Sequence, residues 1–77
     1  KAAVINFQLQ MERLGKEIGV TARQAIGLAT GVPRPSTTSI YYKDPWRMTK
    51  AQERGIFLLF EQSGLVYDPS WGEGAEA

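Results

Sequence analysis

Helix-stopping residues divide this 77-residue chain into short segments, and this division limits its fold more than any other feature. Gly19, Gly31 and Gly64 each follow a run of residues with helical spacing. Pro45 ends another such run, because the residue before a proline avoids the helical region. A single all-α domain, a small bundle of four to five helices, is therefore expected.

The first two helices are predicted at residues 5–18 and from Ala22 to just before Gly31. In the first, four apolar side chains recur at steps of four, three and four and predict a core-facing stripe: Phe7, Met11, Leu14 and Ile18. In the second, Thr21 and Gln24 have the spacing of a capping box. Small residues such as Gly27 allow another helix to approach closely.

The third helix is expected between residue 33 and Lys43. Proline is tolerated in a first helical turn, so Pro33 and Pro35 only limit where this helix begins. Val32 and Ile40 are eight residues apart and are predicted to form its buried face.

Thr49 is expected to cap the last helix, which runs to about Ser63. Its core face is predicted at Ile56, Leu59, Phe60 and Ser63, and Gly55 should permit close packing. Residues 65–67 are β-prone. They either pair with their twin across a dimer or simply form an extended terminus.

Composition excludes several classes of chemistry. The chain has no cysteine and no histidine, which rules out disulfides, thiolate or imidazole metal ligands, and histidine or cysteine catalysis. No pair of carboxylates is spaced to converge on a pocket, so we expect neither an enzyme nor a cofactor. No apolar run approaches the roughly 18 residues that a membrane span needs. A cytoplasmic protein is expected.

The charges are segregated along the chain. Residues 1–60 carry nine lysines and arginines against four carboxylates, a net charge of +5. Residues 61–77 carry four carboxylates and no basic residue. We interpret the sequence as a basic domain over residues 1–67, which favours an anionic partner, followed by a flexible acidic tail over residues 68–77.

The stretch "ARQAIGLATGVPRPSTTSIYYKD" resembles the lambda-repressor-like helix-turn-helix family, which includes the Cro and xenobiotic-response-element regulators. The family pattern "xQxxLAxxxGVSxxTISxIExG" lies over residues 22–43, and "TLxxIxxALExAGVxF" lies over residues 49–67. The likeness covers about residues 7–67. Four features depart from the pattern: Arg23 for glutamine, Gly27 for alanine, Thr37 at an apolar position, and "PRPS" at the head of the recognition helix.

The resemblance implies roles for particular residues. The recognition helix would face DNA bases with Arg34, Pro35, Thr38 and Ser39. Phosphates would be met by Arg23, Gln24, Ser36, Tyr42, Lys43, Arg47 and Lys50. A dimer interface would use Phe57, Phe60, Leu65, Val66 and Tyr67. An alternative to DNA contact is an ordinary solvated surface position, and it applies to Arg34, Lys43 and Lys50. Packing within the domain, rather than stacking on bases, is expected for Tyr41 and Trp46.

The function that follows is sequence-specific DNA binding by a homodimer on a palindromic operator. A phage or mobile-element repressor, a Cro-like protein or an antitoxin would fit, associated with the nucleoid of a bacterial or phage-infected cell. The alternative is a small helical protein–protein interaction module, such as a phage adaptor or inhibitor, that kept the fold without DNA binding.

Overall fold

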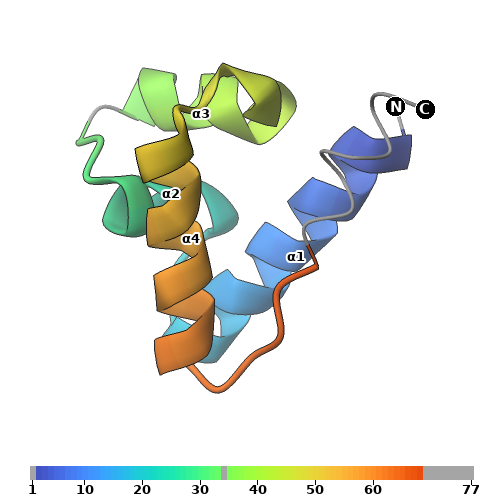
Figure 1. Ribbon diagram of the computed structural model, residues 1–77, viewed down its shortest axis with the longest axis vertical. Helices are drawn as coiled ribbons and strands as arrows, with labels where there is room; N and C mark the ends of the chain where they lie inside the picture. Colours follow the sequence, from blue (N-terminus) through green and yellow to red (C-terminus); the bar gives the residue numbers. More distant parts are fainter. Residues whose placement is uncertain (1, 34, 69–77) are drawn as a thin grey trace.

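The computed structural model describes residues 2–33 and 35–68, with side chains from residue 3 onward. Within these ranges the chain is all-α, as predicted, and forms no strand. Its elements are α1 (Ala2–Ile18), α2 (Ala22–Thr30), α3 (Pro35–Lys43), the 3-10 helix η1 (Pro45–Arg47) and α4 (Lys50–Gln62). Figure 1 shows α3 lying across the N-terminal end of α4, and the segment after α4 returning along α1. No helix in the described ranges has the length and apolarity to cross a membrane.

The helix boundaries follow from local side-chain chemistry. The predicted capping box at Thr21 is present: its hydroxyl accepts from the Gln24 N–H at 3.1 Å, and the Gln24 Oε1 accepts from the Thr21 N–H at 2.9 Å. Thr49 and Gln52 form the same motif before α4. Gly31 ends α2 with a φ of 76°, a left-handed conformation that costs glycine little.

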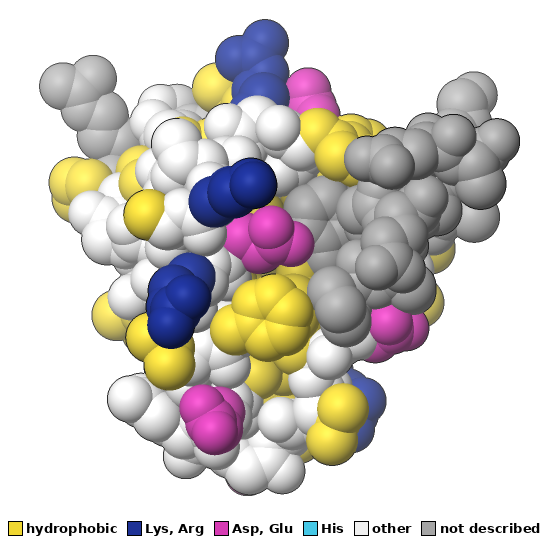
Figure 2. Space-filling model, in the orientation of Figure 1, with side chains coloured by type: hydrophobic (Ala, Val, Ile, Leu, Met, Phe, Trp, Pro, Cys, Tyr) yellow, Lys and Arg dark blue, Asp and Glu magenta, His cyan; other side chains and the backbone are white. Residues whose placement is uncertain are grey.

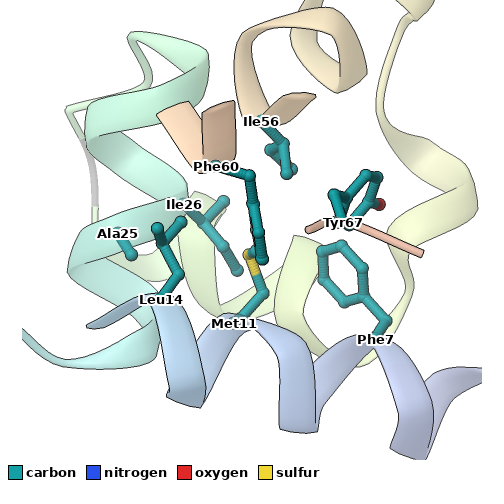
Figure 3. Close-up of a cluster of buried hydrophobic side chains, with 8 residues drawn as sticks. All are labelled: Phe7, Met11, Leu14, Ala25, Ile26, Ile56, Phe60 and Tyr67. Atoms are coloured by element: carbon teal, nitrogen blue, oxygen red, sulfur yellow. The ribbon is translucent and has the colours of Figure 1, made fainter. Parts of the chain in front are cut away.

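The core lies where α1, α2 and α4 meet. Of the predicted stripe of α1, Phe7, Met11 and Leu14 are completely buried, and Ile18 is partly buried against the same cluster. Figure 3 shows these side chains meeting those of α2 and α4. The buried hydrophobic cluster consists of Phe7, Met11, Leu14, Ala25, Ile26, Ile56, Phe60 and Tyr67.

The buried face of α3 differs from the prediction. Thr38 is buried at 4% exposure, whereas Ile40 is 42% exposed. The reason is that Tyr41 and Tyr42 also pack against the core cluster, and only Thr38 shares a helical face with both of them. Opposite Thr38, a Cβ added to Gly27 would lie 3.3 Å from the Thr38 methyl, so the small residue of α2 makes room for a threonine.

The segment after α4 packs on its own domain. Tyr67 is 7% exposed, and its ring centroid lies 4.7 Å from that of Phe57 and 4.8 Å from that of Phe60. Next to it, the side-chain amide of Gln10 donates to the Asp68 carbonyl at 2.9 Å and accepts from the Asp68 N–H at 2.6 Å. The Gln10 side chain thus provides the two backbone hydrogen bonds that a neighbouring strand would otherwise make with Asp68.

This packing corrects two of the predicted interface residues. Phe60 is 1% exposed and Tyr67 lies in the core, so neither side chain is available to a second copy. Among the other three, Phe57 and Val66 are exposed at 41% and 80%, and Leu65 is half-buried. Of the predicted tail, Asp68 is fixed to Gln10, and residues 69–77, with Trp71, lie outside the described residues.

Candidate nucleic-acid interface

The surface of α2 and α3 is built from a stretch of sequence without carboxylates. From Ile18 to Lys43 the chain contains no aspartate or glutamate, and its charged residues are Arg23, Arg34 and Lys43. Every formal side-chain charge that this stretch contributes is therefore positive. Arg34, one of the predicted base contacts, lies outside the described residues, directly before the start of α3 in the sequence.

One face of α3 points away from the domain. Ser36, Ile40 and Lys43 are exposed and Ser39 is half-buried, at positions that share a helical face. Pro35 is exposed at the head of the helix. Hydroxyls can donate to or accept from base edges, and an apolar side chain suits the methyl group of thymine. Ile40 belongs to this face, which the sequence prediction missed because it assigned Ile40 to the core.

Thr38 does not belong to this face, which corrects its predicted role as a base contact. Its side chain is buried, and its hydroxyl donates to the Pro35 carbonyl at 2.9 Å. A bond of this kind, from a side chain to the carbonyl three residues back, closes the first turn of α3. Thr38 therefore shapes the helix and does not contact a ligand.

Two of the predicted phosphate contacts, Arg23 and Tyr42, lie together. The Arg23 guanidinium carbon is 5.9 Å from the centre of the Tyr42 ring, a cation–π distance. The Tyr42 hydroxyl is hydrogen-bonded to the Glu12 carboxylate, and the Gln8 amide donates to the Tyr42 carbonyl at 3.1 Å. Tyr42 thereby connects α1, α2 and α3. Its hydroxyl is engaged by Glu12, whereas Arg23 remains exposed to solvent.

The remaining predicted phosphate contacts are exposed, but some of their polar groups already bond to other groups of the domain. Gln24 uses its carbonyl oxygen for the cap of α2, which leaves its amide NH2 as a donor. The Arg47 Nε lies 3.4 Å from an Asp44 carboxylate oxygen, an exposed pair that reduces the positive charge of η1. Lys43 ends α3 and Lys50 begins α4, and Figure 1 shows these two helix ends on the same side of the domain.

The environment of Tyr42 gives a testable pH dependence. Burial, and then the hydrogen bond and negative charge of Glu12, raise the pKa of Tyr42 to about 12, with Arg23 acting in the opposite direction. The ordinary tyrosine value is about 10. Because folding favours the neutral phenol, this contribution to stability is complete below about pH 10 and is lost as the pH rises toward about 12.

We therefore expect the free energy of unfolding to fall over this window by more in the parent than in Tyr42→Phe. Phenolate absorbance should show one tyrosine titrating near pH 12, a step that is absent in Tyr42→Phe and shifted downward in Glu12→Gln. Identical titration curves for the parent and Tyr42→Phe above pH 10 would show that Tyr42 is not the perturbed group.

A hollow of about 730 Å³ lies beside the head of α3, between that helix and α2. Arg23 and Gln24 contribute its polar side. Leu28, which is 65% exposed, is among its apolar residues, together with Val20, Val32, Pro33 and Pro35. This surface is suited to an apolar side chain of a ligand, and the sequence prediction did not identify it because Leu28 was read only as part of a helix.

Comparisons with known proteins add no family assignment. No protein-family model matches the chain, and neither a curated protein nor a solved structure matches it significantly. Among the described residues, no group of three or more acidic, histidine or cysteine side chains is placed to hold a metal ion. What the protein binds is therefore inferred from its own residues.

Proposed function

We propose that the protein binds double-stranded DNA through α3, as a helix-turn-helix module of the lambda-repressor-like type, and represses transcription by occupying its site. The observation that carries the proposal is the face of α3 itself. It presents hydroxyl groups, one isoleucine and one lysine on a surface to which residues 18–43 contribute no carboxylate. The bases and phosphates of a duplex offer the complementary groups.

The dimensions of the element agree with this role. An α-helix with its side chains is about 10–12 Å across, so a helix such as α3 can enter a B-DNA major groove, which is about 12 Å wide. In this proposal Ser36, Ser39 and Ile40 face base edges, and Arg34 at the head of the helix pairs with guanine. The exposed Arg23 and Lys43 contact phosphates on either side.

The test is selection of bound sequences from a pool of random duplexes, followed by affinity measurements on the selected site at several salt concentrations. We expect affinity to fall steeply with salt, because each phosphate contact releases counterions. Lys43→Ala should lower the salt slope by about 1, and Arg34→Ala should lose about 1–3 kcal/mol of discrimination at one base pair.

Lys16→Ala provides the matched control. Lys16 is an exposed lysine near the C-terminal end of α1, away from α3 (Figure 1), and its loss should leave binding nearly unchanged. Failure to enrich any sequence, or a Lys43→Ala variant whose affinity and salt slope match those of Lys16→Ala, would contradict binding through α3.

The protein–protein interaction module remains the second candidate, and the apolar hollow beside Leu28 favours it. A partner that inserts an apolar side chain there would bind with little dependence on salt. Leu28→Asn would abolish that binding, because burying an unpaired polar side chain is costly. The substitution adds no charge beside Arg23, so DNA binding through the outer face of α3 would persist and the two functions are separable.

A further inference from the structure

The outward face of α4 combines apolar and charged side chains in a definite order. Phe57 and Leu58 are 41% and 48% exposed at its centre. Arg54 lies one turn before them and Glu61 one turn after them, and both are exposed. Figure 2 shows this face of the molecule, with hydrophobic side chains at the surface, basic side chains and an acidic one toward the α3 end, and a further acidic side chain at the opposite end.

Arg54 and Glu61 do not form an ion pair with each other within one molecule. Arg54 and Glu61 are separated by about 10 Å along the helix axis, which is beyond the reach of an ion pair between neighbouring turns. Among the described residues, neither side chain makes an ion pair. Toward the start of α4 the same face also carries the exposed Lys50 and the half-buried Glu53. The face thus has an apolar centre, a net positive charge on one side and a single anion on the other.

We propose that this face binds a second copy of the chain, with the two α4 helices antiparallel. The midpoint between Phe57 and Leu58 is also the midpoint between Arg54 and Glu61. A two-fold axis through that point places Arg54 opposite Glu61 of the partner subunit, and Glu61 opposite Arg54 of the partner subunit. The same operation sets Phe57 against the partner's Leu58, so one patch is complementary to itself.

A parallel arrangement is disfavoured by the same charges. It would bring the two Arg54 side chains together and the two Glu61 side chains together, and like charges juxtaposed at an interface are costly. The antiparallel arrangement also determines where the other helices lie. Because α3 crosses the N-terminal end of α4 (Figure 1), the two α3 helices lie at opposite ends of the dimer.

The experiment reverses the charges one at a time and measures mass in solution, without DNA, by sedimentation. The parent should form a dimer of twice the 8.5 kDa chain mass. Arg54→Glu places an anion on each side of the apolar centre, and Glu61→Arg places a cation on each side. Each variant alone should raise the dimer dissociation constant at least about tenfold through like-charge repulsion.

Mixing the two variants supplies the decisive result. In the mixed dimer both charge pairs are opposite in sign, so an equimolar mixture should form a heterodimer with near-parental affinity. The double variant, with both charges exchanged in one chain, should again self-associate. A mixture that stays monomeric, or a double variant no tighter than the single ones, would overturn the antiparallel pairing.

The apolar centre is tested separately by Leu58→Asp, with Leu9→Asp as the matched control. Leu9 is 59% exposed on α1, outside the proposed interface. Leu58→Asp should yield monomer and Leu9→Asp should leave the dimer intact, with unchanged circular dichroism in both. A monomeric parent at its highest soluble concentration, or equal effects of the two variants, would contradict the proposal.

Dimerisation and DNA binding can fail independently. A monomeric parent that still binds its selected duplex removes only the α4 interface. A dimeric parent that enriches no duplex removes only the DNA-binding proposal.

Discussion

Replacing Tyr67 by alanine is expected to lower the free energy of unfolding by about 3–5 kcal/mol, the usual cost of removing a buried aromatic side chain. Tyr67 is almost completely buried, and its ring contacts those of Phe57 and Phe60. Figure 3 shows it closing the core on the side of Phe7. A domain of this size has only a few kcal/mol of net stability, so this variant should be largely unfolded.

Urea denaturation followed by circular dichroism measures this loss. The adjacent Val66, which is 80% exposed, provides the control, and Val66→Ala should change stability by less than about 0.5 kcal/mol. Gln10→Leu should cost about 1–3 kcal/mol, because both backbone groups of Asp68 lose their partner. Equal midpoints for Tyr67→Ala and Val66→Ala would show that residues 65–68 do not pack on the core in solution.

The helix ends were predictable because they depend on residues close together in the sequence. Thr21 with Gln24 forms the cap that their spacing predicts, and the same holds for the start of α4 at Thr49. Gly31 ends α2 because a backbone with positive φ is needed at that point. Such signals are complete within four residues, so no knowledge of the tertiary structure is required.

The last segment was not predictable in the same way, because its partners are distant in sequence. Residues 65–67 have strand propensity, yet Gln10, 58 positions away from Asp68, provides the hydrogen bonds that a strand would need. A signal was present: Gln10 shares its helical face with Phe7 and Leu14, and a polar residue on an apolar stripe needs a buried partner. Sequence alone does not identify that partner.

The candidate site was predictable in its location but not in all its residues. The charge pattern and the turn at Gly31 lead to α3, and Ser36 and Lys43 are exposed as expected. Thr38 and Ile40 exchanged roles, because the eight-residue spacing from Val32 to Ile40 predicted the wrong buried face for α3. Packing of Tyr41 and Tyr42 sets the rotation of this helix, and a local pattern does not include that information.

The close crossing of α2 and α4 leads to the last prediction, which concerns Gly55. As the sequence predicted, this glycine permits close packing: a Cβ at its position would lie 2.0 Å from the Ala29 carbonyl oxygen. The Gly55 Cα that would carry this Cβ and the Ala29 carbonyl both belong to helix backbones, so neither can move aside alone. Helix propensity favours alanine over glycine by about 1 kcal/mol, yet we expect Gly55→Ala to lower the free energy of unfolding by at least about 2 kcal/mol.

The physical reason is that the added methyl must push α2 away from α4. Ile26 and Ile56 pack in the core from these two helices, so separating the helices weakens the core as well. Ala51→Gly, at an exposed position in the first turn of α4, measures propensity without a clash and should cost at most about 1 kcal/mol. Thermal and urea denaturation of both variants separate the effect of helix propensity from that of the clash. Propensity alone would make Gly55→Ala more stable than the parent. That result would mean that α2 and α4 do not cross this closely.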